Sequence, residues 1–89
     1  MPLVGIPSLL RDLTGGEKSA LAEGDTVHQV IENLEKRFPG IQERLCDGDR
    51  LRPGIAVIVD GNTSTLKLRQ RVQESSEIHF VISISGGMV

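Results

Sequence analysis

The residues best suited to chemistry in this sequence are Gly86 and Gly87, which are followed only by Met88 and Val89. Glycine loses more conformational freedom on folding than any other residue, so a glycine pair resists being fixed in a helix or strand. A peptide without Cβ atoms can instead enter a narrow slot in another protein, where its acyl carbon is open to a nucleophile. This pattern indicates that the carboxyl of Gly87 is the reacting group and that Met88-Val89 is a removable cap. The alternative is a frayed terminus without a role.

The other candidate reactive groups are His28, His79 and Cys46. Both histidines are expected on the outer faces of their elements, and with Cys46 they make no recognised metal-ligand spacing. A lone cysteine is more often a buried structural thiol than a nucleophile. The sequence therefore predicts neither an internal catalytic set nor a metal site.

Three cations, Lys67, Arg69 and Arg71, alternate along the chain. An extended strand would place all three on one face. They form a candidate docking patch for an acidic partner, and such a patch beside the tail would orient the two glycines. The alternative is a charged edge strand that resists aggregation.

Composition narrows the class of protein. The 89 residues fit one domain, and 38% hydrophobic with 25% charged residues is typical of a folded chain. A net charge of −2 and only two aromatic residues, Phe38 and Phe80, argue against nucleic-acid binding. With Cys46 as the only cysteine, no secretory signal and no membrane-spanning stretch, we expect a cytoplasmic protein without a membrane role.

The clearest predicted element is a helix from Thr26 to Arg37. Its apolar residues fall at helical spacing and form one stripe, made of Val27, Val30, Ile31, Leu34 and Phe38. Thr26 and Gln29 predict a capping box at the start, and Pro39-Gly40 predicts the end.

The strands are predicted from short apolar or alternating runs. A turn at Thr14-Gly15-Gly16 separates the first two, and Asp60-Gly61-Asn62 predicts a hairpin. Residues 55–59 do not alternate, which predicts a central strand covered on both faces. One further helical turn is expected at 41–45 and a polar loop from Asp47 to Gly54. The expected strands are 3–6, 17–21, 55–59, 63–69 and 78–84. With the helix they give the order ββαβββ, an α+β fold in which one main helix covers one face of a mixed sheet of four to five strands.

This element order, ending in a di-glycine tail, resembles the β-grasp sulfur carriers of the MoaD/ThiS family, which are relatives of ubiquitin. Within that family the likeness is strongest to the CysO-type carriers of cysteine biosynthesis. The similar segments are Ile6-Pro7-Ser8-Leu9-Leu10-Arg11, Thr14-Gly15-Gly16-Glu17-Lys18-Ser19, Gly24-Asp25-Thr26, Val30-Ile31-Glu32-Asn33-Leu34-Glu35 and Gly40-Ile41-Gln42-Glu43-Arg44-Leu45. The resemblance covers essentially the whole chain and implies a β-grasp domain over 1–84 followed by a flexible tail over 85–89.

The resemblance also implies a chemistry for the tail. An E1-like adenylating enzyme would recognise Ser85, Gly86 and Gly87 and join the Gly87 carboxylate to AMP. A sulfur donor protein or sulfide would then displace AMP and leave a thiocarboxylate. The chain would be a protein cosubstrate rather than an enzyme and would bind no cofactor, since ATP is consumed by the activating enzyme.

Met88 and Val89 depart from the family's usual ending. A carboxylate at Val89 cannot give a glycyl thiocarboxylate, so a protease is expected to remove both residues. The resemblance implies a JAMM-type metalloprotease for this step. The final sulfur acceptor would be a synthase, for which a pyridoxal-phosphate enzyme is one candidate.

Other functions fit the same tail. A ubiquitin-like modifier would join Gly87 to lysines of target proteins, and a molybdopterin synthase small subunit would pair stably with a large catalytic subunit. A β-grasp interaction module would leave the tail idle.

Overall fold

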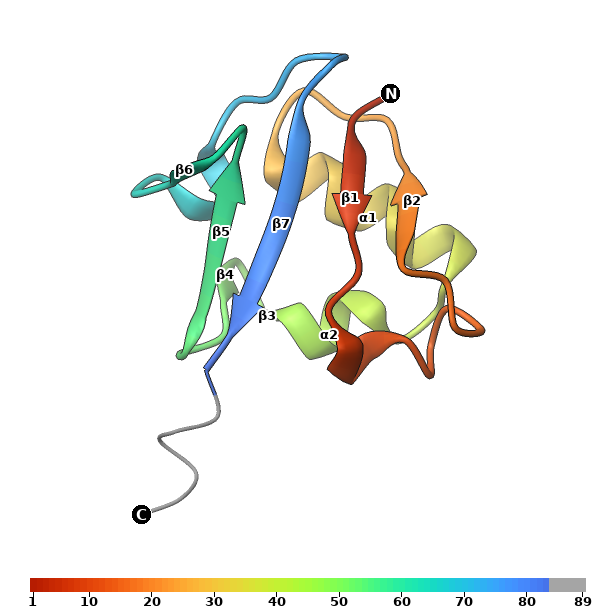
Figure 1. Ribbon diagram of the computed structural model, residues 1–89. Coiled ribbons are helices and arrows are strands. Elements are labelled where there is room, and N and C mark those ends of the chain that lie inside the picture. The colour runs from red at the N-terminus through yellow and green to blue at the C-terminus, as the bar shows by residue number, and fades with distance from the viewer. Residues whose placement is uncertain (84–89) are drawn as a thin grey trace.

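The computed structural model describes residues 1–83. Its main sheet has five strands in the order β2-β1-β7-β5-β6. The strands are β1 (Leu3–Gly5), β2 (Ser19–Leu21), β5 (Ile55–Val59), β6 (Asn62–Thr63) and β7 (Glu77–Ile82). β1 and β7 run parallel, and the other neighbouring pairs are antiparallel. With the main helix after β2, this sheet confirms the predicted ββαβββ order and the mixed α+β architecture (Figure 1).

The main helix is α1 (Val27–Arg37), and it is positioned by its cap and its apolar stripe. The Thr26 hydroxyl accepts a hydrogen bond from the Gln29 amide at 3.2 Å, and the Gln29 side chain accepts one from the Asp25 amide at 2.8 Å. The capping box is therefore confirmed, with Asp25 as the second partner. Val27, Val30, Ile31 and Leu34 are buried against the sheet.

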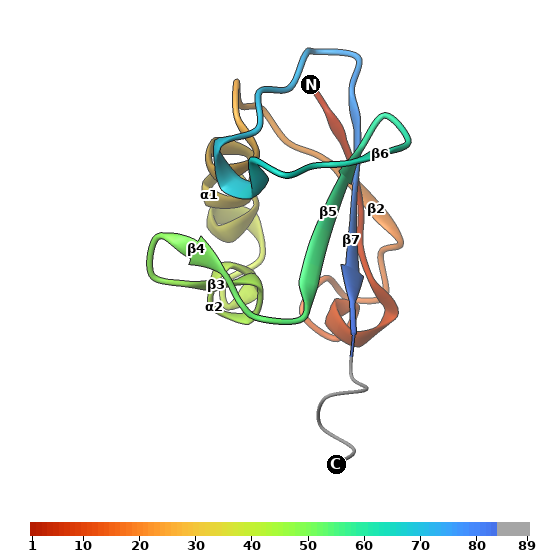
Figure 2. The same ribbon diagram turned by 90° about the vertical axis from the view of Figure 1, so that its left-hand side faces the viewer.

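A single hydrophobic core lies between the sheet and the helices. α1 and the shorter α2 (Ile41–Leu45) lie on one side of the sheet; on the other side the residues 1–83 place no α-helix, and only the short 3-10 helix η1 (Ser8–Leu10) lies at its lower end (Figure 2). The buried sheet residues include Val4, Val57 and Ile78, each with no exposed surface. No helix among residues 1–83 is long and apolar enough to cross a membrane.

The prediction that residues 55–59 form a central strand covered on both faces is wrong. The central strand is β7, which pairs with β1 on one side and β5 on the other. In β5, Ile55 and Val57 are buried, whereas Ala56 and Ile58 on the opposite face are only half-buried. An apolar residue on that face remains partly exposed because only one layer of helices covers the sheet.

Two further segments differ from their predictions. The expected polar loop from Asp47 to Gly54 contains a small hairpin of β3 (Cys46–Asp47) and β4 (Arg50–Leu51), in which Leu51 is buried. The predicted strand over 63–69 is wrong, because β6 ends at Thr63 and a short 3-10 helix, η2, spans Lys67–Arg69. The Ser64 hydroxyl accepts hydrogen bonds from the amides of Leu66 and Lys67 and so favours a local turn over a strand.

Candidate functional site

The tail residues predicted from the sequence lie outside the described part of the structure. These are Ser85 and Gly86, the proposed reacting residue Gly87, and the cap residues Met88 and Val89. The structure does describe the strand that leads to them.

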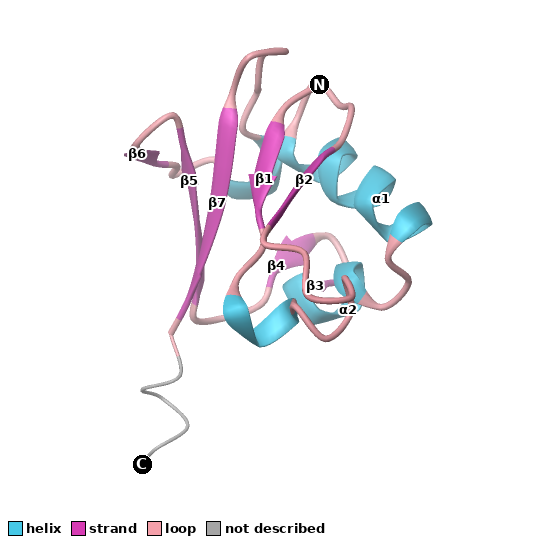
Figure 3. Ribbon diagram, turned by 45° about the vertical axis from the view of Figure 1, so that its right-hand side comes forward, coloured by secondary structure: helices cyan, strands magenta, loops and turns pink. Residues whose placement is uncertain are grey.

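The root of the tail is the carboxyl end of the central strand. β7 is held by β1, where Gly5 pairs with His79, and by β5, where Ile55 pairs with Ile82 (Figure 3). The alternation predicted for this strand is confirmed, since Ile78 and Phe80 are buried while His79 and Val81 are exposed. A strand paired on both sides and buried on one face gives the tail a fixed starting point.

The turn between β4 and β5 contacts the end of β7. The Ser83 amide donates a hydrogen bond to the Gly54 carbonyl at 2.8 Å, one residue beyond the last paired residue, Ile82. Gly54 has a φ of +86°, and an added Cβ would lie 3.1 Å from the Ser83 carbonyl oxygen. From the sequence, Gly54 is expected only as the last residue of a polar loop. The Pro53-Gly54 pair signals a turn there, but its contact with residue 83 depends on the tertiary structure.

The open face of the sheet runs up to the same end. Its exposed apolar side chains include Leu3, Leu21 and Val81, which are 37%, 48% and 49% exposed. Between them lies His79, whose Nε2 is 3.3 Å from Glu77 Oε1. Exposed apolar groups gathered on one sheet face are typical of a surface that contacts another protein.

A shallow basic hollow of about 250 Å³ borders this face, and it is lined by Gly5, Pro7, Arg11, Lys18 and His79, with Ile6 and Phe80. Among the described residues neither Arg11 nor Lys18 takes part in an ion pair. Arg11 Nε donates to the Ile6 carbonyl at 3.1 Å, which directs its side chain along the loop. The hollow therefore offers positive charge to an acidic group.

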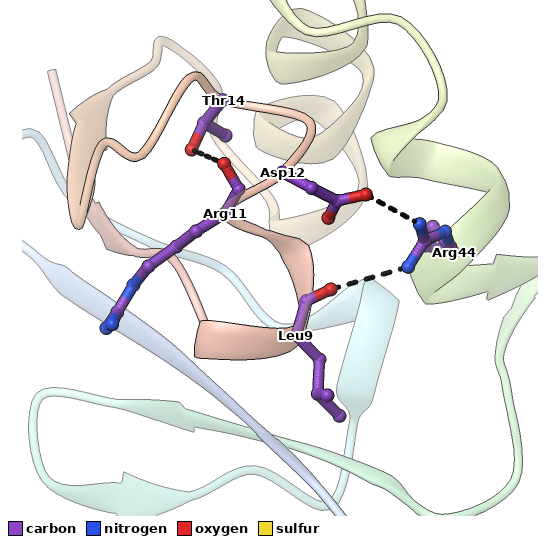
Figure 4. A network of polar contacts seen from close by, with 5 residues as sticks. All are labelled: Leu9, Arg11, Asp12, Thr14 and Arg44. Atoms are coloured by element: carbon purple, nitrogen blue, oxygen red, sulfur yellow. Dashed lines mark hydrogen bonds and ion pairs between the residues drawn. The ribbon is translucent and has the colours of Figure 1, made fainter.

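The loop that carries Arg11 is fastened to α2. Arg44 lies 3.2 Å from Asp12 Oδ2 and 3.4 Å from the Leu9 carbonyl oxygen (Figure 4). Within the loop, the Thr14 hydroxyl bonds to the Arg11 and Glu17 carbonyls. These contacts fix the position of the loop, and with it the position of Arg11 in the basic hollow.

The remaining candidate reactive groups are not brought together in the described structure. His28 lies on α1 with Nε2 4.0 Å from Glu32, while His79 lies on the open sheet face. Cys46 is buried, and burial raises the pKa of its thiol despite the positive charge of Arg52. Among residues 1–83, no group of three or more His, Cys, Asp or Glu side chains could hold a metal ion.

The predicted alignment of Lys67, Arg69 and Arg71 along one strand is wrong. Lys67 and Arg69 are exposed on η2, with the buried Leu68 between them, and η2 packs against α1 and β4. Arg71 instead pairs with Thr26 at the start of α1. The segment that carries the three cations therefore lies beside α1, on the helical side of the sheet (Figure 2).

Known proteins share this fold and this sequence pattern. CysO sulfur carrier proteins of Mycobacterium tuberculosis and Mycobacterium bovis are 54% identical over 44 residues, which are 49% of this chain and 47% of theirs. The matched region thus spans about half the length of these curated relatives.

Two solved structures match nearly the whole chain. The first comes from the BexX/CysO complex of Amycolatopsis orientalis, with 34% identity and a TM-score of 0.91, covering 98% of this chain and 100% of that one. The second is CysO of Mycobacterium tuberculosis, with 31% identity and a TM-score of 0.85, covering 93% of this chain and 99% of that one. These matches confirm the predicted β-grasp fold.

The sequence pattern of the ThiS family matches residues 4–87, from β1 to the second glycine of the tail. Because this match covers almost the entire chain and agrees with the fold, the protein belongs to the ThiS family.

Proposed function

We propose that this chain is a sulfur carrier of the CysO type, a protein cosubstrate that carries sulfur on the carboxyl group of Gly87. The observation that carries the proposal is the extent of the family match, which begins in β1 and ends at Gly87. The strong likeness to CysO chains over almost the full length supports it.

The proposed chemistry has two steps. The Gly87 carboxylate attacks the α-phosphorus of ATP in the activating enzyme, so that an acyl-adenylate forms and pyrophosphate leaves. Sulfide, or a persulfide on a donor protein whose sulfur is later released by a thiol reductant, then attacks the acyl carbon and displaces AMP. The missing side chain at Gly86 and Gly87 leaves that carbon open to the nucleophile.

Processing would come before activation. Hydrolysis of the Gly87–Met88 peptide bond by a JAMM-type metalloprotease would free the Gly87 carboxylate. The family match supports this order because it stops at Gly87 and leaves Met88 and Val89 outside.

Partner enzymes would recognise the folded domain as well as the tail. CysO of Amycolatopsis orientalis forms a complex with BexX, and we extend this behaviour to a sulfur-accepting synthase for the present chain. The basic hollow and the open sheet face, which reaches the root of the tail at Val81, are candidate contact surfaces. The patch of Lys67, Arg69 and Arg71 stays a second candidate, for an acidic region of the activating enzyme.

The decisive experiment compares a chain ending at Gly87 with the full sequence. Each is incubated with ATP, sulfide and an E1-like enzyme, and intact mass reports the exchange of one oxygen for sulfur. We expect only the shortened chain to react. A shortened Gly87→Ala chain is the matched control, because it keeps the carboxylate and adds only a methyl group beside the acyl carbon.

Two results would contradict the proposal. If the shortened chain forms no adenylate or thiocarboxylate, the carrier function is wrong. If protein purified from its native host retains Met88-Val89 while sulfur transfer proceeds, the processing step is wrong. Lysine conjugates in place of a thiocarboxylate would indicate the modifier function.

A further inference from the structure

Two hollows of opposite charge border the open face of the sheet, and His79 lines both of them. The first is the basic hollow, whose charged side chains are those of Arg11 and Lys18. The second, of about 490 Å³, is lined by two acidic residues, Asp60 and Glu77, and we call it the acidic hollow. Its other lining residues are Ile58, Gly61, Ser75 and His79.

The register of the sheet places the two hollows on opposite sides of His79. Across the sheet, His79 lies between Gly5 of β1 and Ile58 of β5. The basic hollow includes residues of β1 and the loop after it, whereas the acidic hollow includes residues of β5 and the turn after it. Along β7, the basic hollow includes Phe80 after His79, and the acidic hollow includes Glu77 before it. The two hollows therefore lie diagonally across the face.

The charged side chains of both hollows are available to a partner. The ion pairs among residues 1–83 include neither Arg11, Lys18 nor Asp60. Figure 4 shows that the Arg11 side chain points away from the ion pair that fastens its loop. The Glu77 carboxylate contacts His79, which carries a charge only when it is protonated. Each hollow therefore fits a group of the opposite charge.

A second copy of this chain matches both hollows at once. When two identical faces meet through a half-turn about an axis lying between them, each point meets the point equally far on the other side of that axis. An axis that passes over His79, perpendicular to the line between the hollows, places the basic hollow of each copy against the acidic hollow of the other. Both contacts then form in one isologous interface. Any other partner would need two groups of opposite charge at the same spacing.

The exposed apolar side chains fit the same arrangement. Leu3 and Leu21 are paired across β1 and β2 and lie level with Glu77, so they occupy a corner outside the line between the hollows. Val81, which is paired with Ala56 of β5, lies toward the opposite corner. Both corners lie near the axis, so the half-turn brings each one close to its own copy. Exposed apolar surface is thereby removed from water, which favours association.

We propose that the open sheet face is a self-association surface through which two copies of the chain form a face-to-face dimer with two-fold symmetry. The basic hollow of each copy binds the acidic hollow of the other, and the apolar corners pack together near the axis. This association needs neither the tail nor an activating enzyme. Because the same face is a candidate contact surface for partner enzymes, the dimer would compete with them.

The test reverses one charge in each hollow of the full-length chain, with Lys18→Glu in one variant and Glu77→Lys in the other. Both side chains are exposed. Each contact between hollows occurs twice in the dimer, so a single variant converts two attractive contacts into repulsive ones. Sedimentation equilibrium measures the dimer Kd of each chain. We expect each variant alone to raise Kd by about tenfold or more, because an exposed charge pair contributes up to about a factor of five and two pairs are reversed.

An equal mixture of the two variants gives the sharper result. In a mixed dimer, one contact between hollows has both charges reversed and the other is unchanged, so both are attractive. We expect the mixture to dimerise about as tightly as the wild-type chain, and this recovery would also show that both variants are folded. A mixture that dimerises no more tightly than the separate variants would overturn the two-fold arrangement.

The matched controls are Glu32→Lys and Lys36→Glu, which make the same charge changes at exposed positions of α1. Glu32 also lies beside a histidine, as Glu77 does. We expect each control to change Kd by less than about twofold, because α1 lies on the other side of the sheet. Equal weakening by the controls would indicate net charge alone and would overturn the proposal. A wild-type chain that remains monomeric at about 1 mM would also overturn it.

Backbone amide chemical shifts over a concentration series locate the interface in the wild-type chain. We expect concentration-dependent changes at Leu3, His79 and Val81, which belong to the open face. Changes confined to α1 would overturn the proposal. Neither measurement uses the adenylation reaction, so the outcome is independent of the proposed sulfur-carrier function.

Discussion

The imidazole of His79 lies against Gly5 on the open face of the sheet. The two residues are paired across the parallel strands β7 and β1. A Cβ at position 5 would come within 2.8 Å of the His79 Cε1 atom and would also meet Nδ1. The absence of a side chain at Gly5 is therefore what lets this ring lie over Gly5, where both residues line the basic hollow.

This relationship predicts that the effect of Gly5→Ala on stability depends on whether residue 79 is histidine or alanine. With His79 replaced by Ala, Gly5→Ala should raise the free energy of unfolding by about 0.5–1 kcal/mol, because alanine orders at lower entropic cost in a strand. With His79 present, displacement of the ring should cancel that gain. Urea unfolding of the four chains in a double-mutant cycle measures the difference. Equal effects of Gly5→Ala in both backgrounds would show that the ring is not held there.

Cys46 predicts a specific loss of stability at alkaline pH. Burial raises the pKa of its thiol above the ordinary value of 9.0. At a pH between the pKa values of the unfolded and folded chains, the thiol therefore ionises only in the unfolded chain, and this ionisation stabilises the unfolded state. The contribution of the neutral Cys46 thiol to the free energy of unfolding is fully present below the pKa of the unfolded chain. It is lost as the pH rises through the pKa of the folded chain. Urea unfolding at increasing pH should show a steeper decline for wild type than for Cys46→Ala. A difference between the two chains that does not vary with pH would contradict this.

Gly24 should tolerate a side chain less well than Gly15 does. Its φ is +153°, and an added Cβ would lie 2.7 Å from the Val30 amide nitrogen in α1. We expect Gly24→Ala to lower the free energy of unfolding by more than about 2 kcal/mol, because backbone atoms must move. Gly15→Ala is the control, since its φ is +67° but nothing lies within 4 Å of the added Cβ. Its cost should be about 1–2 kcal/mol.

The two contacts of Arg44, with Asp12 and with the Leu9 carbonyl, should differ in how strongly salt weakens their contribution to stability. The Asp12–Arg44 ion pair is exposed, so Asp12→Asn should lower stability by less than about 1 kcal/mol, and high salt should remove most of that effect. Arg44→Ala should cost more, because it also removes the contact with the Leu9 carbonyl. Thermal unfolding at low and high salt tests this. An Asp12→Asn effect that is insensitive to salt would contradict an ion-pair contribution.

The patch of Lys67, Arg69 and Arg71 should influence how fast an acidic partner associates. Arg69→Glu should slow association with the proposed E1-like activating enzyme by a few-fold at low salt, and the effect should shrink as salt rises. Lys36→Glu is the matched control, because it makes the same charge change at an exposed position of α1. Stopped-flow mixing measures both rates. Equal slowing by the two variants would indicate net charge alone and would remove the patch from the docking surface.

Local signals were sufficient for much of this fold. The apolar stripe of α1, its cap at Thr26 and its end before Pro39-Gly40 depend on residues within a few positions of one another. The alternation of buried and exposed residues in β7 and the order of the elements in the main sheet were also predicted from the sequence. The strand prediction over 63–69 failed because the hydrogen bonds of the Ser64 hydroxyl and the burial of Leu68 outweighed a weak strand preference.

The sequence by itself determined the family resemblance and the position of Gly87 as the candidate reacting residue. It also determined the departure from the family's usual ending at Met88-Val89. These features depend on short runs of consecutive residues. Only the tertiary structure decided that β7 is the central strand, that His79 lies over Gly5 and that Gly54 holds Ser83. Each of these joins residues far apart in the chain. Such contacts depend on strand pairing and on which face of the sheet the helices cover, and neither is encoded in a local pattern.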